Sequence, residues 1–373
     1  MKILHVYSGN LFGGIESMLL TCARVPTEVS GIEHSFALCF DERLASELRA
    51  LASPVHLLGP VTMRRPGSVH TARRALDEVL TSRAFDRVIC HAPWSHALFA
   101  GVVRRHRRVP LVFWAHDRMA GRHWTERLAK HTRPDFVVCN SAFTASTLRV
   151  LFPGIRSAVI HPPVGERQVL RERRYVRMSL DTAEDAVVII QASRCEPWKG
   201  HRLLLDALSQ LTDLPGWVWW VAGGAQRDEE QTFLDTLRTE AERARVNDRI
   251  RWLGDRADVP TLLAAADVHC QANVEPEPFG IVFVEALAAG LPIVAVDEGG
   301  VVEIVDRSCG LLVPPRDARA LAEALRTVVG DAVYRRQLAS GTKDRARRLC
   351  DPVTQLTRLA EALSGLGPLE MAG

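Results

Sequence analysis

Short apolar runs rich in β-branched residues alternate along the chain with stretches of helical, amphipathic pattern. Continuous apolar runs separated by helices predict parallel strands that are covered on both faces of a sheet. In the first half we expect strands at 2–8, 34–40, 55–59, 86–91, 110–116, 135–140 and 157–164. In the second half we expect strands at 186–194, 216–224, 249–255, 266–272, 292–300 and 310–315.

This order of elements predicts an α/β protein with two Rossmann-like, doubly wound parallel-sheet domains in tandem, which face each other across a cleft. We expect an N-terminal domain at 1–165, a polar and basic linker at 166–185, and a C-terminal domain at 186–350. A helix and tail at 351–373 follow, and whether they pack back on the first domain is open. Ligands of open α/β sheets bind at the carboxyl ends of strands, so the loops after strands are expected to carry the chemistry.

Composition narrows the class of protein. A chain of 373 residues with 47% hydrophobic and 24% charged residues is typical of a soluble protein with two ordinary domains. No apolar run reaches the roughly 18 residues that cross a bilayer, and the first ten residues predict a strand rather than a signal peptide. Eight scattered cysteines without a CxxC pair predict buried thiols in a reducing cytoplasm, not disulfides or a zinc site.

The charge is unevenly distributed. Residues 1–165 carry 21 Lys and Arg against 12 Asp and Glu, a net of +9, whereas residues 166–373 carry 26 against 32, a net of −6. The basic first half favours an anionic partner such as a membrane surface or a phosphorylated substrate, and we expect no nucleic-acid partner. A solvated face rich in arginine explains the same charge equally well.

Two loops of the first half are candidates for ligand binding. Gly13 and Gly14 stand where the first strand passes into a helix, so backbone amides can approach an anion or a sugar closely. His116 follows the strand at 110–116 and can hydrogen-bond a ligand hydroxyl or a leaving oxygen. Simple turn chemistry and a structural loop histidine are the competing interpretations.

The first loop of the second half is basic. In "QASRCEPWKG", Arg194 stands at the strand end and Lys199 five residues later. Arginine offers a planar fork and lysine a point charge, so the two can converge on one diphosphate. A solvated basic loop is the alternative.

The stretch "EPFGIVFVE" places a carboxylate at each end of an apolar run. We expect a helix over 279–289, with Glu277 just outside its start and Glu285 more than a turn inside. Unpaired amides of a first helical turn bind phosphate. These amides belong to Phe279, Gly280, Ile281 and Val282.

Carboxylates beside a phosphate site repel the anion unless they hold neutral, hydroxyl-bearing parts of the same ligand. Glu277 and Glu285 therefore favour a sugar, a diphosphate and a ribose in one molecule, which is a nucleotide sugar. A helix with one capping and one surface glutamate is the competing explanation.

These pieces resemble the retaining glycosyltransferase family 4, whose members have GT-B architecture and use nucleotide sugars. "EPFGIVFVEALAAGLPIVAVDEGGVVEIV" resembles the family's motif of two glutamates separated by seven residues, and "SRCEPWKG" resembles its arginine–lysine loop. Gly13-Gly14, His116 and the closing segment "GLLVPP" resemble further pieces in the same order, so the likeness covers most of the chain. One departure is the extra acid Glu275, two residues before Glu277.

The resemblance implies roles for these residues. Arg194 and Lys199 neutralise the diphosphate, Glu277 holds sugar hydroxyls, Glu285 holds the ribose hydroxyls, and the amides of residues 279–282 hold phosphate and sugar. The nucleotide base lies near Arg256, and His116 touches the donor sugar near its reacting face.

The chemistry implied is sugar transfer to a hydroxyl acceptor with retention of configuration. The chain contains no Asp-x-Asp triplet, so we expect no metal and no cofactor, with cations and helix amides in the metal's place. Same-face attack, in which the leaving phosphate accepts the acceptor's proton, is the family's account.

The acceptor stays undetermined at this stage. Basic runs at 104–108 and 122–133, the second with Trp124, suit contact with anionic lipid, so we expect a cytoplasmic protein that either is free or rests on the inner membrane face. This favours cell-envelope polysaccharide or glycolipid synthesis. The alternatives are the tailoring of a small soluble acceptor, another GT-B enzyme such as a nucleotide-sugar 2-epimerase, and a binding protein without turnover.

Overall fold

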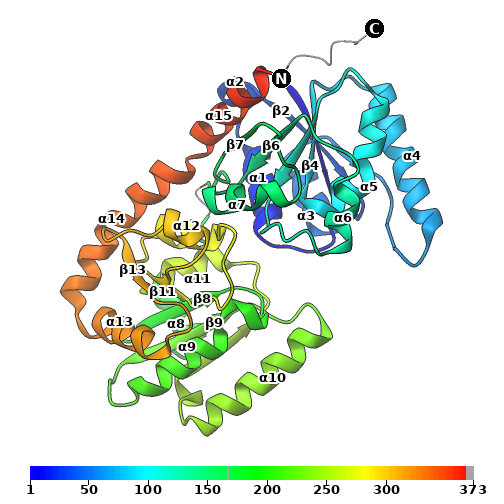
Figure 1. Cartoon of the computed structure of the whole chain (residues 1–373). Coiled ribbons are helices and arrows are strands. Elements are labelled where there is room, and N and C mark those ends of the chain that lie inside the picture. Colours follow the sequence, from blue (N-terminus) through cyan, green and yellow to red (C-terminus); the bar gives the residue numbers. More distant parts are fainter. Residues whose placement is uncertain (166–167, 367–373) are drawn as a thin grey trace. The chain divides into compact units, whose positions relative to one another are not determined.

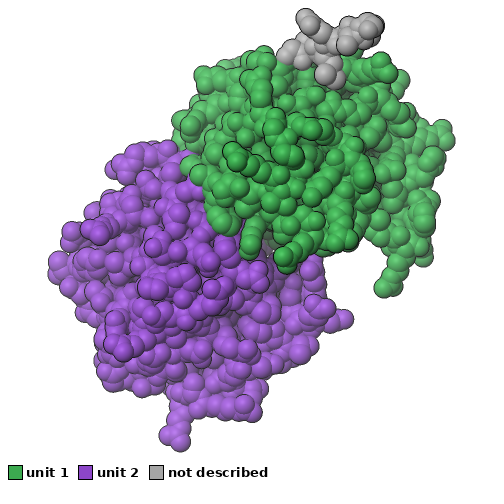
Figure 2. Space-filling model, viewed as in Figure 1, with its two compact units in different colours: residues 1–165, 350–373 green, residues 166–349 purple. Residues whose placement is uncertain are grey.

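The computed structural model describes residues 1–165 and 168–366. The chain forms two compact units: unit 1 contains residues 1–165 together with the segment from 350 onward, and unit 2 ends at 349 (Figure 2). Each unit has its own parallel sheet, so the predicted fold class of two parallel α/β domains is confirmed. The last helix therefore belongs to unit 1 rather than to the unit that precedes it in the chain.

The sheet of unit 1 has seven parallel strands in the order β3-β2-β1-β4-β5-β6-β7. Figure 1 labels β2, β4, β6 and β7 of this sheet. The order reverses after β1, as in doubly wound sheets. The strands are β1 Lys2–Tyr7, β2 Glu33–Leu38, β3 Val55–Leu57, β4 Arg87–His91, β5 Leu111–Ala115, β6 Phe136–Cys139 and β7 Ser157–Val159.

The helices of unit 1 cover a core of strand residues such as Val88 and Phe113, both fully buried. The last helix contacts α1 and α2, and Arg87 donates to the carbonyl of Leu363 at 2.9 Å. The helices are α1 Gly14–Arg24, α2 Thr27–Ser30, α3 Arg43–Ala50, α4 Pro66–Ser82, α5 Ala92–Arg105, α6 Trp124–Ala129, α7 Ala142–Thr147 and α15 Pro352–Ser364. The part of the expected tail at 367–373 lies outside the described residues.

The sheet of unit 2 has six parallel strands in the order β10-β9-β8-β11-β12-β13. Its core includes Trp217 and Trp219, which are 2% and 0% exposed. The strands are β8 Val187–Ala192, β9 Trp217–Ala222, β10 Ile250–Gly254, β11 Val268–Gln271, β12 Ile293–Val296 and β13 Gly310–Val313. The helices are α8 Arg173–Ser179, α9 His201–Leu208, α10 Asp228–Arg243, α11 Val259–Ala265, α12 Ile281–Ala288, α13 Ala318–Gly330 and α14 Ala332–Cys350.

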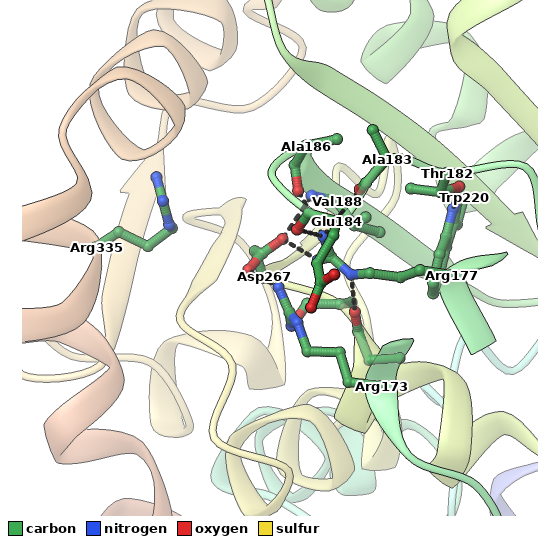
Figure 3. Close-up of polar contacts among 12 residues, drawn as sticks. Arg173, Arg177, Thr182, Ala183, Glu184, Ala186, Val188, Trp220, Asp267 and Arg335 are labelled. Carbon is green, nitrogen blue, oxygen red and sulfur yellow. Dashed lines mark hydrogen bonds and ion pairs between the residues drawn. The ribbon is translucent and has the colours of Figure 1, made fainter. Parts of the chain in front are cut away.

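The segment expected to be a linker differs from that expectation in its described part. It forms α8, which packs against α11 of unit 2, and Arg177 on α8 is only 1% exposed. Figure 3 shows Arg177 beside Asp267 and Ala186. The Arg177 guanidinium donates to the carbonyls of Ala265 and Ala186 at 3.0 and 2.8 Å and to the Asp267 carboxylate at 2.5 Å. A basic residue thus anchors this segment, whereas residues 166–167 lie outside the described part.

All eight cysteines lie in the described part of the chain and are buried. Within residues 1–165 and 168–366, no helix combines the length and the apolar content that a membrane span needs.

Candidate functional site

The loops after β8 and β11 are held together by close backbone approach. Lys199 ends a short 3-10 turn at Pro197–Lys199, and Gly200 follows it with φ of 76°. A Cβ at Gly200 would lie 1.6 Å from the carbonyl oxygen of Ala272, so this position admits no side chain. The amide of Val274 donates to the Trp198 carbonyl at 2.9 Å. These contacts fix the Lys199 loop against the loop that carries Glu277.

Glu277 is the centre of a buried polar network. Its carboxylate oxygen Oε2 accepts from Lys199 Nζ at 2.8 Å, from Asn273 Nδ2 at 2.7 Å and from Gln271 Nε2 at 3.4 Å. Glu277 is 7% exposed, and its side chain and that of Lys199 are 10% and 16% exposed. All three donors converge on one oxygen, and no described residue donates to Oε1.

Supporting contacts orient this network. Gln191 on β8 is fully buried and donates through Nε2 to the Lys199 carbonyl at 2.9 Å, and the Lys199 ammonium lies 3.7 Å from the centre of the Trp198 ring. The backbone of Glu277 pairs with Gly299, where a Cβ would approach the Glu277 carbonyl oxygen to 2.5 Å. The carboxylate is therefore positioned by both its side-chain and its backbone neighbours.

Sequence reasoning missed Asn273 and Gln271. A signal existed for Gln271, because it is a polar residue inside an apolar run that forms the buried strand β11. Buried amides of this kind need hydrogen-bond partners. Gln271 Nε2 donates to Asn273 Oδ1 at 2.8 Å and to the Glu277 carboxylate at 3.4 Å.

Helix α12 begins later than the expected range of 279–289. It spans Ile281–Ala288, and Gly280 precedes it with φ of 91°, a left-handed conformation that favours glycine. A Cβ at Gly280 would lie 2.5 Å from the Phe283 ring. Because the helix begins at Ile281, Phe279 and Gly280 precede its first turn, contrary to expectation, and the Phe279 side chain is 1% exposed and belongs to the core. Ile281 remains in that turn.

Two other predicted residues lie on the same helix. Val282 is in its first turn, where amide groups have no intrahelical acceptor, and it is partly exposed. Glu285 lies one turn further on and is half-buried. The first turn of α12 therefore places backbone amide groups next to the loop that carries Glu277.

Arg194 follows β8 and is held by two acids. Its guanidinium donates to Glu196 at 2.6 Å and to Glu230 at 3.3 Å, and Glu230 is only 4% exposed. Among the described residues, Arg194 and Lys199 share no ion-pair partner, so their joint grip on a diphosphate stays a prediction. The two acids that hold Arg194 were not found from the sequence.

Arg256 lies after β10 in a bidentate pair with Asp258, with both donor–acceptor distances at 2.7 Å. The hydrogen bonds that Arg256 donates to Asp258 raise the pKa of Arg256 and lower the pKa of Asp258. No described residue links this pair to Glu277.

The predicted residues of unit 1 lie at the carboxyl ends of β1 and β5. Gly14 opens α1, and the amide of Gly13 donates to Glu16 Oε2 at 2.9 Å. Tyr7 donates to the other oxygen of Glu16 at 2.7 Å. His116 follows β5, is 7% exposed and is hydrogen-bonded through Nε2 to another histidine. Burial lowers the pKa of His116 to about 3, so this ring is neutral at physiological pH.

Two Rossmann-like units, each with an entirely parallel sheet and with polar side chains at strand carboxyl ends, are the architecture of GT-B glycosyltransferases. The family described as "Glycosyltransferase Family 4" matches residues 12–167, and "Glycosyl transferases group 1" matches residues 173–345. Together they cover most of the chain, which belongs to the family 4 glycosyltransferases.

Solved structures and curated relatives agree with this assignment. The structure of Anabaena HepE in complex with UDP-glucose matches with a TM-score of 0.85 and 27% identity, over 98% of this chain and 100% of that one. The chain is 32% identical over 209 residues to a D-inositol 3-phosphate glycosyltransferase of Jonesia denitrificans, which is 54% of this chain and 47% of the relative. It is also 32% identical to the lipopolysaccharide core glycosyltransferase LpsE of Rhizobium meliloti, over 57% of this chain and 59% of LpsE. The matched part thus spans about half the length of these curated relatives.

Proposed function

We propose that this protein transfers a sugar from a nucleotide-diphosphate sugar to a hydroxyl acceptor, with retention of configuration and without a metal ion. The observation that carries the proposal is the arrangement of Glu277. Three donors occupy Oε2, and Oε1 is left to accept hydrogen bonds beside the start of α12.

A carboxylate held in this way suits a sugar. Oε1 has two lone pairs, so it can accept hydrogen bonds from two neighbouring sugar hydroxyls. Lys199 offsets the negative charge of Glu277, which reduces the repulsion between this carboxylate and a nearby phosphate. The amides of Ile281 and Val282 then donate hydrogen bonds to phosphate oxygens at the helix start.

The remaining predicted residues complete the proposed donor site. Arg194 contacts the diphosphate, Glu285 the ribose hydroxyls and Arg256 the neighbourhood of the base. In unit 1, Gly13, Gly14 and His116 contact the donor sugar. Cationic groups and amides that are fixed before the reaction stabilise a leaving diphosphate electrostatically, which is the role that a divalent ion has in other transferases.

We further propose a uridine nucleotide as the donor, because the Anabaena neighbour was solved with UDP-glucose. Lipopolysaccharide-core and phosphatidyl-inositol transferases are among the relatives, which supports an acceptor of the cell envelope. On α6, Trp124 and Leu128 are 39% and 45% exposed within the basic run at 122–133, which favours peripheral contact of this cytoplasmic enzyme with anionic lipid.

A thermal-shift screen tests the donor. UDP, GDP, ADP and dTDP, each with and without an attached hexose, are added in the presence of EDTA, and a nucleotide that binds the folded protein raises the melting temperature. We expect the largest shift with a uridine nucleotide and no loss of the shift in EDTA. If none of the four raises the melting temperature, the proposed donor class is refuted.

Turnover tests the role of Glu277. Glu277→Gln should lower the rate of donor consumption roughly 10- to 100-fold, the scale of a hydrogen bond to a charged group worth about 1.5–3 kcal/mol. Glu275→Gln is the matched control, because Glu275 is exposed and lies two residues earlier. Equal rates for the two variants would remove Glu277 from the site. Rapid donor conversion without an acceptor would indicate an epimerase instead.

A further inference from the structure

Four histidines form a continuous hydrogen-bonded row across the sheet of unit 1. They come from β2, β1, β4 and the residue after β5, which are neighbours in the sheet. His34 Nδ1 lies 2.9 Å from His5 Nε2, His5 Nδ1 lies 2.8 Å from His91 Nε2, and His91 Nδ1 lies 2.9 Å from His116 Nε2. Every internal contact therefore joins Nδ1 of one ring to Nε2 of the next.

The row is buried and lined by aromatic rings. His5 and His91 are fully buried, and His34 and His116 are 8% and 7% exposed. Trp114 stacks on both His91 and His116, with ring planes inclined by 26° and 12°. Such packing fixes the orientation of the rings and excludes water from the internal contacts.

Burial keeps these rings neutral. It lowers the pKa of His34 to about 4 and that of His116 to about 3, and it lowers the pKa values of His5 and His91 well below the usual range. The nearby Tyr7 ring makes a T-shaped contact with His91. Burial raises the pKa of the Tyr7 phenol, which donates a hydrogen bond to Glu16. At neutral pH the row thus carries one ring proton per histidine.

Geometry then allows only two proton arrangements. A neutral imidazole has one N–H and one bare nitrogen, and each contact between two rings needs one donor and one acceptor. If His116 carries its proton on Nδ1, its Nε2 is an acceptor, so His91, His5 and His34 must all be protonated on Nδ1. In the reverse arrangement all four rings are protonated on Nε2.

The far end of the row distinguishes the two arrangements. His34 Nε2 is buried and has no hydrogen-bond partner among the described residues. The reverse arrangement would place an N–H there without an acceptor, and orphaned buried N–H groups are rarer in proteins than orphaned acceptors. The first arrangement leaves a bare nitrogen at this end and places the N–H at His116 Nδ1, which, unlike His34 Nε2, is not among the fully buried nitrogens without a partner.

We propose that His34, His5 and His91 are positioning residues that hold His116 in its neutral, Nδ1-protonated form, so that it donates a hydrogen bond to an oxygen of the ligand. The identity of that ligand oxygen, a hydroxyl of the donor sugar, rests on the proposed function. The tautomer itself does not.

Nitrogen NMR reads the tautomer directly. Protein labelled with ¹⁵N-histidine and free of nucleotide is recorded at pH 7, and long-range ¹H–¹⁵N correlations separate the two neutral forms and the cation. His116→Asn identifies the His116 signals by their loss. We expect all four rings to be neutral and protonated on Nδ1. Opposite tautomers within the row, four Nε2-protonated rings, or a cation at any of the four positions would overturn the proposal.

A matched pair of variants at the far end tests the coupling. Asn and Asp place their terminal atoms near the position of His34 Nδ1, but ionised Asp only accepts hydrogen bonds, whereas Asn can also donate. His34→Asp should force a proton onto His5 Nε2. The other rings must then change tautomer in turn, which leaves His116 protonated on Nε2. His34→Asn should keep the wild-type tautomer.

Kinetics then connect the tautomer to function. In His34→Asp we expect kcat to fall roughly tenfold, with a KM for the donor that changes less than about twofold, because the lost hydrogen bond acts mainly in the transition state. An unchanged His116 tautomer in a folded His34→Asp protein would overturn the coupling. If that variant fails to fold, the wild-type spectrum alone decides. A protein that binds no nucleotide sugar but shows the expected tautomers would refute the proposed function and leave this inference intact.

Discussion

Removing the positive charge beside Glu277 should destabilise unit 2 measurably. Lys199 and Glu277 lie 2.8 Å apart, with side chains that are 16% and 10% exposed. Loss of one partner of a buried ion pair costs about 3–5 kcal/mol, because the other charge is left uncompensated. In Lys199→Met, the amides of Asn273 and Gln271 still donate to the carboxylate, and each such bond contributes about 1 kcal/mol. Subtracting these two contributions, we expect a loss of about 1–3 kcal/mol.

Urea unfolding, followed by far-UV circular dichroism, measures this loss of unfolding free energy. The loss is read from the unfolding transition whose midpoint shifts in the variant. Arg319→Met is the control, because Arg319 forms an exposed pair with Glu323 on the same unit, and exposed pairs contribute about 0–1 kcal/mol. The double variant Lys199→Met/Glu277→Gln removes both charges and should recover most of the loss. Strictly additive effects, or a loss no larger than that of the control, would refute the electrostatic reasoning.

Three further perturbations have defined outcomes. Arg177→Met should cost about 3 kcal/mol in urea unfolding because it leaves Asp267 and several buried carbonyls short of donors, whereas Arg173→Met, which is more exposed, should cost about 1 kcal/mol or less. Gly280→Ala should cost about 1–3 kcal/mol and weaken donor binding in calorimetry, because its φ is left-handed and its Cβ would clash with a ring. Since burial lowers the pKa values of His34 and His116 to about 4 and 3, the unfolded chain binds more protons between those values and about 6.5. The unfolding free energy of unit 1 should therefore be highest above pH 6.5 and should fall on acidification by about 1.4 kcal/mol per pH unit for each such histidine. Urea midpoints that do not change between pH 7.5 and 5.5 would contradict this.

The positions of the strands could be anticipated because their signal is local. A parallel strand covered on both faces needs a continuous apolar run, and each predicted strand is present with ends no more than five residues from those expected. The expectation of a linker at 166–185 did not hold for its described part, because the contacts that decide it are not local in the sequence. Its arginines predicted a solvated segment, since arginine is almost never fully buried unless paired. Arg177 is buried because it satisfies backbone carbonyls and pairs with Asp267, which lies 90 residues away.

The candidate site was only partly accessible to sequence reasoning. Glu277 and Lys199 were expected in one site, and the structure joins them directly. The histidine row was not anticipated, although His5, His34 and His91 each lie in a predicted strand. Which side chains meet across parallel strands depends on the stagger between those strands, and no local pattern encodes that stagger. The start of α12 was misplaced because an apolar run does not reveal a left-handed residue such as Gly280.

Net charge predicts the chemistry of these two halves poorly. The second half is acidic overall, yet it carries the cations proposed to bind a diphosphate, and each of those cations is held by a carboxylate: Lys199 by Glu277, and Arg194 by Glu196 and Glu230. A cation that is already paired keeps its position before the ligand arrives, so less reorganisation is needed when charge develops on the leaving phosphate. The first half is basic overall, yet the residue proposed to face the sugar is a neutral imidazole. Fixed neutral donors suit hydroxyl groups, and fixed paired cations suit phosphates, so local pairs rather than net charge decide which kind of ligand group each half is suited to bind.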